Sequence, residues 1–207
     1  MTAVLSSCST LDSAVNNQTN QPENIVTVES ADVSPQPADI TANPETLRIL
    51  AKETLNWTDC INIAKNETKL LDFITWGRAV SDAELFDRLI DRAFIPYSQS
   101  ITSTNWSLAK PTSEETVTRA GAAFFIWHIY AEARSNPRLL SLYAARYANQ
   151  PNPVSPIADV PVRSPFFNSI LGSIEMEFLS LTDDRNFSPA QPIRGAELLA
   201  ILRKIEN

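Results

Sequence analysis

Residues 120–131 of this chain read AGAAFFIWHIYA, and this stretch decides the kind of fold that the chain adopts. With its flanks it predicts a helix over residues 117–134 that is apolar on nearly every side. A helix of that kind has no face suited to solvent, so we expect it at the centre of the molecule. The other helices then have to pack around it.

Amphipathic helices are predicted on both sides of this central stretch, and two signals mark their starts: a capping Asn or Ser and a proline at the first helical position. They begin at Asn43-Pro44 (running to Leu55), near Leu70, at Ser81-Asp82, at Asn136-Pro137, at Ser164-Pro165 and shortly before Leu198. Residues 97–116 have no sustained period and predict a long loop that carries Trp106. Very little of the sequence is typical of strands, so the predicted fold class is mainly α.

Composition limits the possible functions. Of the 207 residues 43% are hydrophobic and 20% are charged, which is ordinary for a soluble globular protein. The net charge of −7 argues against a nucleic-acid partner. Loops that hold nucleotide phosphates need glycine, and the chain has 4 glycines against 14 prolines, so we predict no nucleotide cofactor. No stretch approaches the ~20 apolar residues of a membrane-spanning helix.

The N-terminal segment contains a possible lipid-attachment site. Leu5-Ser6-Ser7-Cys8 resembles a bacterial lipobox, whose cysteine is lipidated. Such a signal also needs a charged region and about 7–15 apolar residues before it, and only four residues precede Leu5. Either the true start lies upstream and Cys8 is lipidated, or the match is accidental. Residues 9–43 are polar and lack aromatic residues, so residues 1–43 are predicted to be a lipobox-like start and a disordered tether.

Four blocks occur in a fixed order near the C-terminus. They are Ile157-Ala158-Asp159-Val160, an apolar helical face over 165–179, Asp184-Arg185-Asn186-Phe187-Ser188-Pro189, and Pro192-Ile193-Arg194-Gly195-Ala196-Glu197-Leu198-Leu199. Their order and spacing resemble the S-layer homology repeat, in which an (F/I)-x-D-V opening, a helix and a D-G-x-F-x-P loop precede a second helix that opens with (V/I)-T-R-A-E. Arg185 stands where that family usually has glycine. Residues 154–207 are therefore identified as one such repeat.

A weaker copy of the pattern lies upstream, at about residues 80–135 of the helical region 44–153. Its first helix is 82–95, and Val117-Thr118-Arg119-Ala120 opens its second helix without the family's glutamate. Residues 44–78 are long enough for a degenerate third unit, although no motif marks one. The resemblance thus implies a helical repeat bundle of helix-loop-helix units after the tether.

The resemblance also implies a function: a non-enzymatic cell-envelope protein that binds peptidoglycan-linked polysaccharide in grooves between repeats. The ligand-binding residues that it implies are Thr118, Arg119, Arg194, Glu197 and Asp184. Free N–H groups and the helix dipole after Thr118 would form an anion site, and Arg119 could grip a carboxylate with two parallel hydrogen bonds. In the C-terminal unit, Arg194 occupies the threonine position. In the competing interpretation these residues only cap or solvate helix ends.

Other functions are weighed against this one. The alternative is a non-enzymatic helical scaffold lipoprotein that binds a protein partner in the envelope. Location at the periplasmic face of the outer membrane follows if Cys8 is lipidated, and a cytoplasmic location follows if Met1 is the true start. His128 is the only histidine and lacks enough neighbouring ligands for a metal site, so we predict no metal, no cofactor and no catalytic set. Cys60 is predicted to be a small buried side chain.

Overall fold

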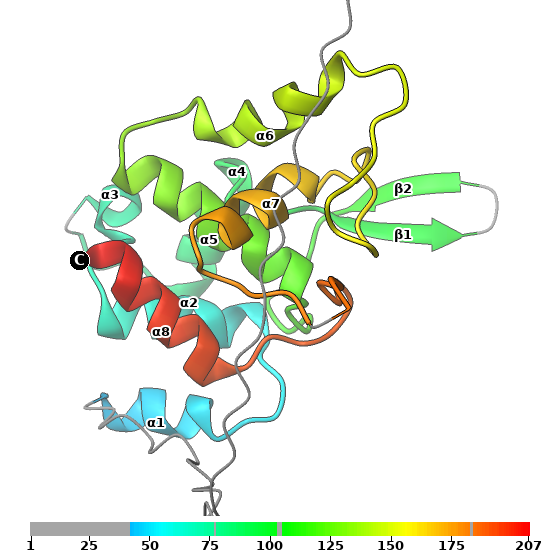
Figure 1. Ribbon diagram of the computed structural model, residues 1–207. Coiled ribbons are helices and arrows are strands. Elements are labelled where there is room, and N and C mark those ends of the chain that lie inside the picture. Colours follow the sequence, from blue (N-terminus) through cyan, green and yellow to red (C-terminus); the bar gives the residue numbers. More distant parts are fainter. Residues whose placement is uncertain (1–41, 77, 103–104, 183) are drawn as a thin grey trace, which may run out of the picture. The chain divides into compact units, whose positions relative to one another are not determined.

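Helices dominate the part of the chain that the structure describes. This computed structural model describes residues 42–76, 78–102, 105–182 and 184–207, except the side chains of 98–108. Within these ranges the helices are α1 (Pro44–Leu50), α2 (Trp57–Glu67), α3 (Asp72–Thr75), α4 (Asp82–Asp91), α5 (Arg119–Ala133), α6 (Leu139–Ala148), α7 (Phe167–Glu175) and α8 (Gly195–Glu206) (Figure 1). The strands are β1 (Ser98–Thr102) and β2 (Asn105–Ala109). The prediction of a mainly α fold is confirmed.

Side-chain caps fix the starts of several helices. The side chain of Asn43 accepts the N–H of Glu45 at 2.9 Å, and Pro44 takes the first position of α1. Ser81 caps α4 by accepting the N–H of Glu84 at 3.2 Å. Each cap satisfies an amide that has no partner inside its own helix. Both predicted starts are therefore confirmed.

The first helix ends earlier than predicted, and a helix that was not predicted follows it. We expected one helix from Asn43 to Leu55, but α1 ends at Leu50 and α2 begins after Asn56. The side chain of Asn56 accepts the N–H of Asp59 at 2.8 Å, and the Asp59 carboxylate accepts the N–H of Asn56 at 3.2 Å. This reciprocal pair satisfies two amides at once, which favours a new helix start over continuation of α1.

The predicted loop over residues 97–116 contains a β-hairpin. β1 and β2 pair antiparallel, with Ser98 opposite Ala109 and Thr102 opposite Asn105. Figure 1 shows the hairpin extending away from the helices. The prediction of an irregular loop was therefore wrong for these two segments. The sequence between them has no Asn-Gly or Asp-Gly pair, which is the strongest local signal of a hairpin.

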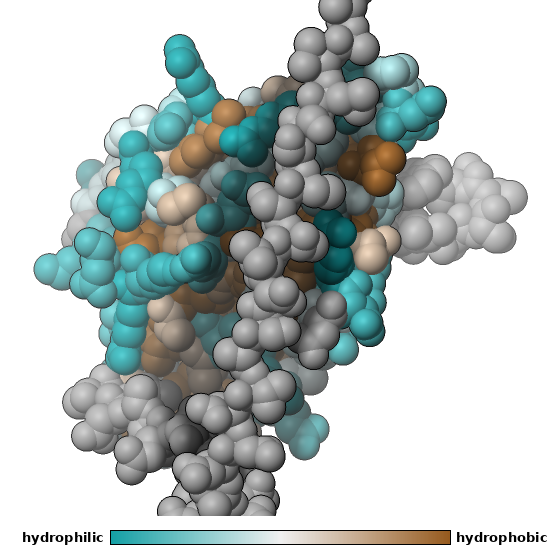
Figure 2. Space-filling view, in the orientation of Figure 1, coloured by the Kyte–Doolittle hydropathy of each residue, from teal (hydrophilic) through white to brown (hydrophobic). Residues whose placement is uncertain are grey.

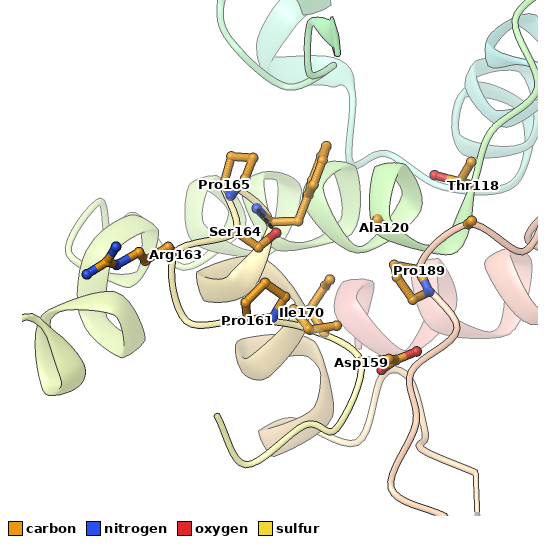
Figure 3. Close-up of a pocket in the computed structure, with 12 residues that line it drawn as sticks. Thr118, Ala120, Asp159, Pro161, Arg163, Ser164, Pro165, Ile170 and Pro189 are labelled. Carbon is orange, nitrogen blue, oxygen red and sulfur yellow. Dashed lines mark hydrogen bonds between the residues drawn. The ribbon is translucent and has the colours of Figure 1, made fainter. Parts of the chain in front are cut away.

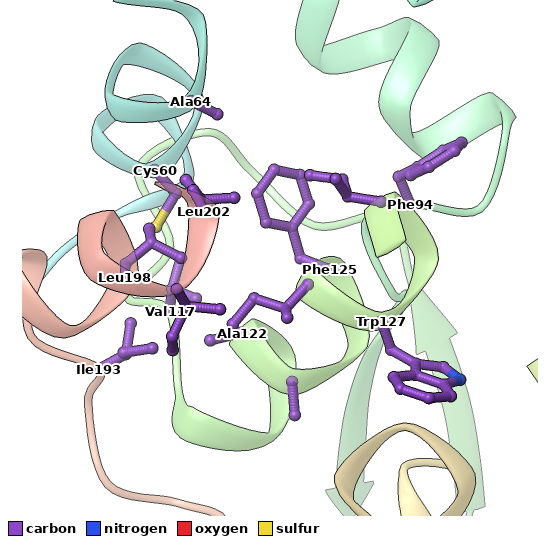
Figure 4. Close-up of a cluster of buried hydrophobic side chains, with 14 of the residues drawn as sticks. Cys60, Ala64, Phe94, Val117, Ala122, Phe125, Trp127, Ile193, Leu198 and Leu202 are labelled. Atoms are coloured by element: carbon purple, nitrogen blue, oxygen red, sulfur yellow. The ribbon is translucent and has the colours of Figure 1, made fainter. Parts of the chain in front are cut away.

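The apolar helix lies at the centre, as predicted. α5 packs against α6, α7 and α8. Phe125, Ile126 and Trp127 in this helix are completely buried. Figure 4 shows Phe125 and Trp127 on opposite sides of the α5 axis, with Val117 and Leu198 nearer the start of the helix.

Three short segments that lead into α2, α5 and α8 lie side by side. The N–H of Val117 donates to the carbonyl of Leu55 at 2.8 Å, and the N–H of Ile193 donates to the carbonyl of Val117 at 3.1 Å. All three side chains are buried. We call Leu55, Val117 and Ile193 the lead-in row. Because each member stands just before a helix, the row brings the N-termini of three helices together.

The surface of the described region is mixed. In the face drawn in Figure 2, hydrophilic residues lie around the periphery and hydrophobic surface is visible between them. Among the described residues, no helix combines the length and the apolar character needed to cross a membrane.

Candidate functional site

Thr118 stands at the start of α5, and the backbone amides that follow it are all engaged. The hydroxyl of Thr118 accepts the N–H of Gly121 at 3.2 Å. The N–H of Arg119 donates to the carbonyl of Gln191 at 2.7 Å, and that of Ala120 donates to the carbonyl of Pro189 at 3.1 Å. The expectation of free amides at this helix end was wrong, because the loop before α8 delivers two carbonyls to them.

The side chain of Arg119 is also occupied, by contacts within the protein. One terminal nitrogen pairs with Glu197 at 2.7 Å, the other donates to the carbonyl of Ser180 at 3.0 Å, and Nε donates to the carbonyl of Phe187 at 3.0 Å. The guanidinium also lies over the Phe187 ring, 4.9 Å from its centre. With 14% of its side chain exposed, Arg119 clamps α5 to α8 and to the loop between α7 and α8.

Asp159 holds the same loop from the other side. Its two carboxylate oxygens accept the N–H groups of Phe187 at 2.8 Å and Ser188 at 2.7 Å. Charge-assisted bonds of this length are among the stronger polar contacts in proteins. The block 157–160 therefore positions the block 184–189. The sequence linked the two blocks only through their order and spacing in the repeat pattern.

The predicted ligand residues separate into two groups. Thr118, Arg119 and Glu197 come together around the start of α5. Arg194 is exposed at the N-cap position of α8, where its side chain makes no capping bond. Asp184 is exposed in the loop before Phe187. Among the described residues, no hydrogen bond or ion pair joins the side chain of Arg194 or Asp184 to the first group.

A cavity of about 660 Å³, which we call the inter-unit groove, opens beside Thr118. It lies between the start of α5, which contributes Thr118 and Ala120, and the range 154–207, which the sequence predicts to be a separate unit. Its lining comprises Thr118, Ala120, Asp159, Val160, Pro161, Arg163, Ser164, Pro165, Phe166, Ile170, Pro189 and Ala190. Sequence reasoning singled out Thr118 alone among these as a ligand residue.

The inter-unit groove combines an apolar floor with a few polar groups. Figure 3 shows Pro161, Ser164 and Ile170 in its middle, facing Thr118 and Ala120 across the opening. The Arg163 side chain extends outward from the rim in this view. Arg163 makes no hydrogen bond or ion pair within the described part of the chain, so its guanidinium can turn toward a ligand. Apolar surface with a few polar contacts is the usual lining of small-molecule sites.

Burial shifts the pKa values of Cys60 and His128, which lie outside the groove. Burial raises the pKa of the Cys60 thiol, with a smaller contribution from the neighbouring Asp59 carboxylate. Burial also lowers the pKa of His128, whose Nδ1 lies 2.8 Å from the carbonyl of Phe124. Cys60 is buried, as predicted. Cys8 and nearly all of the predicted tether lie outside the described residues.

In the part of the chain that the structure describes, no group of three or more His, Cys, Asp or Glu side chains is arranged to hold a metal ion. Comparison of the chain with protein-family models, with curated proteins and with solved structures finds no match.

Proposed function

We propose that this chain is a non-enzymatic binding module of the bacterial cell envelope that holds an acidic cell-wall polysaccharide in the inter-unit groove. The observation that carries the proposal is the position of the groove. It opens at Thr118, between the two units that resemble S-layer homology repeats, where the resemblance expects a glycan.

The lead-in row supports a repeat relation among three units. The helices that follow the row are α2, α5 and α8. In the pairs α2–α5 and α5–α8, the first residue of one helix contacts the third residue of the next helix. Arg119, first in α5, pairs with Glu197, third in α8. Trp57, first in α2, lies against Gly121, third in α5: a Cβ atom on Gly121 would stand 3.4 Å from its ring. We infer that residues 44–78 are the degenerate third unit.

The chemistry of the groove suits a carboxylate-bearing sugar. Proline and aromatic rings such as Pro161, Pro165 and Phe166 offer flat apolar surface to the C–H face of a sugar ring. The hydroxyls of Thr118 and Ser164 can exchange hydrogen bonds with sugar hydroxyls. Arg163 can pair with a carboxylate through two parallel N–H groups. In this proposal Arg119 holds the walls of the groove together and does not contact the ligand.

Lipidation of Cys8 would place the module at the periplasmic face of the outer membrane. The anchor is a separate part of the proposal, and mass spectrometry of the protein from envelope fractions tests it. Two results together would refute the lipid anchor: no lipid on Cys8 of the wild type, and a Cys8→Ala variant that stays in the membrane fraction.

Retention on purified bacterial sacculi tests the binding proposal. The full chain is expected to sediment with sacculi that carry their attached polysaccharide, and to stay in solution with sacculi stripped of it. Ala190→Trp fills the groove from an exposed position. Arg163→Glu replaces its free cation. Both variants are expected to lose most of the retention.

Two matched variants control for size and charge. Ala200→Trp adds the same bulk at an exposed position of α8 away from the groove, and Arg48→Glu makes the same charge change on α1. Both are expected to sediment like the wild type. Equal retention of Ala190→Trp and Ala200→Trp would refute binding in the groove, and no retention of the wild type would refute glycan binding altogether.

The second candidate is a scaffold that binds a protein partner in the envelope. It is favoured by the intramolecular contacts of Arg119, because they occupy the guanidinium group that the family pattern would offer to a glycan. Crosslinking in intact cells followed by purification separates the two. A stoichiometric protein partner together with no sacculus retention would establish the scaffold.

A further inference from the structure

A second cavity lies between the end of α3 and the outer face of α4. It has a volume of about 470 Å³ and is lined by Ile74, Trp76, Arg78, Arg88, Asp91 and Arg92. We call it the Trp76 cavity. It shares no lining residue with the inter-unit groove.

Trp76 is unusual in both exposure and backbone conformation. Its side chain is 76% exposed, although tryptophan is ordinarily well buried. Its φ of 51° puts it in the left-handed region, where large side chains are rare, and its N–H closes α3 by donating to the carbonyl of Asp72 at 2.7 Å. The end of α3 thus presents an indole ring to solvent at the rim of a cavity.

Two arginines in the Trp76 cavity lack a carboxylate partner. Arg88 is fixed, because it donates to the carbonyl of Ile74 at 3.0 Å and pairs with Glu84 at 2.6 Å. Arg78 and Arg92 form no ion pair within the described ranges, and Arg92 lies over the ring of Phe73, 5.4 Å from its centre. An acidic chain of net charge −7 therefore has two unpaired guanidinium groups beside an exposed tryptophan.

We propose that the Trp76 cavity binds a carboxylate-bearing sugar residue. The indole ring stacks on the sugar face, Arg78 and Arg92 take the carboxylate, and Asp91 accepts hydrogen bonds from sugar hydroxyls. Asp91 favours a sugar acid over a phosphate group: it repels the single charge of a carboxylate less than the higher charge of phosphate, and the hydroxyl groups of a sugar can donate to it. A concave site also fits a single sugar ring better than a flat bilayer surface.

This site is independent of the proposed function, because its residues belong to α3, α4 and their flanks, and no residue of α3 or α4 lines the inter-unit groove. If both sites bind one polysaccharide, the second contact becomes intramolecular and raises the overall affinity. Failure of either site leaves the other standing.

Calorimetric titration of the full chain tests the proposal, with trigalacturonate as the acidic probe, maltotriose as the neutral probe and inorganic phosphate as the anion control. Trigalacturonate is expected to bind saturably, and maltotriose at least about tenfold more weakly. Trp76→Asn is expected to weaken trigalacturonate binding about tenfold. Asparagine tolerates the left-handed backbone, so this variant should unfold at or above the wild-type temperature.

The remaining variants locate the binding. Arg78→Gln and Arg92→Gln are each expected to weaken trigalacturonate binding, and Arg48→Gln, which makes the same change on α1, to leave it unchanged. If Trp76→Asn weakens trigalacturonate binding and Ala190→Trp does not, the result supports binding in the Trp76 cavity. If only Ala190→Trp weakens trigalacturonate binding, the probe binds in the inter-unit groove and this inference is overturned. Saturable phosphate binding of equal strength, or no trigalacturonate binding at all, would also overturn it.

Discussion

At position 185 the chain carries an arginine in a left-handed backbone conformation, with φ of 60°. The S-layer homology pattern has glycine here, and glycine adopts this conformation without a steric penalty. Arg185 therefore holds a backbone conformation that glycine would adopt without that penalty. A contact offsets part of its cost: the Arg185 guanidinium donates to the carbonyl of Pro156 at 2.8 Å.

Arg185→Gly should stabilise the protein by up to about 1 kcal/mol, because relief of left-handed strain outweighs one exposed hydrogen bond. Arg185→Ala loses the same bond and keeps the strain, so it should be less stable than both the wild type and the glycine variant. Urea unfolding of the three proteins gives the order. An alanine variant as stable as the glycine variant would contradict it.

Two helical glycines differ in the space beside them. A Cβ atom on Gly172 would stand 2.6 Å from the ring of Trp127, which is completely buried and held by a bond from its Nε1 to the carbonyl of Leu139. Gly172→Ala should therefore lower the free energy of unfolding by roughly 1–3 kcal/mol. Gly121→Ala is the matched control, with 3.4 Å to Trp57.

For Gly121→Ala we expect no loss, or a gain of up to about 1 kcal/mol from helix propensity. Chemical denaturation measures both variants. Equal effects of the two substitutions would mean that α7 can move away from Trp127.

At the scale of whole elements, capping signals predicted well and long-range pairing did not. Asn43 and Ser81 start the helices that the sequence placed there. α2 was missed although Asn56 and Asp59 have the spacing of a capping box, because the apolar residues up to Leu55 extended the preceding helical pattern. The hairpin was missed because its strands are short and no glycine marks its turn. Helix starts are specified by residues within one turn of the helix, whereas a strand is stabilised by pairing with another segment, which its own sequence does not identify.

The clamp between α5 and α8 gives a prediction at this scale. Arg119→Ala should lower the free energy of unfolding by about 2 kcal/mol, because Glu197 and two loop carbonyls lose their donor. Arg119→Lys should recover only part of this, since an ammonium group cannot reach three acceptors with a planar fork. Arg48→Ala, an exposed arginine on α1, should change stability by less than about 0.5 kcal/mol.

A double-mutant cycle with Glu197→Gln isolates the ion pair, with an expected coupling of about 1 kcal/mol. Additive effects of the two substitutions would show that the carbonyl contacts, not the ion pair, hold the clamp.

For the molecule as a whole, one carboxylate joins the two ends of the described chain. Glu67 in α2 accepts the N–H of Asn43 at 2.8 Å and pairs with Arg203 of α8 at 2.8 Å, and its side chain is 6% exposed. Arg203 is 136 residues away from it in the sequence. Neither residue belongs to a motif, so the pair was invisible to sequence reasoning, unlike the four spaced blocks at the C-terminus.

Glu67 predicts an acid-sensitive contribution to stability. Burial acts to raise its pKa, but the Asn43 N–H and the Arg203 guanidinium more than offset this and hold the pKa below the ordinary 4.5. A carboxyl whose folded pKa is lowered stabilises the fold above the unfolded pKa and loses that contribution as the pH falls through the folded pKa. Glu67→Gln should therefore cost roughly 1–3 kcal/mol at neutral pH.

That cost should shrink below about pH 4, where the wild-type carboxyl also takes up a proton. Thermal unfolding from pH 3 to pH 7 measures it. Glu53→Gln, at an exposed carboxyl on the turn after α1, should follow the wild type throughout. A Glu67→Gln deficit that is constant over this range would contradict the ionic role.

The lead-in row has a consequence for the order of events during synthesis. Its last member, Ile193, and the α8 residues Glu197 and Arg203 are made after the residues that they contact, and the clamp at Arg119 spans 78 residues of chain. Contacts between distant parts of a sequence form late and slowly. A nascent chain that lacks α8 therefore cannot complete the buried contacts at the starts of α2 and α5.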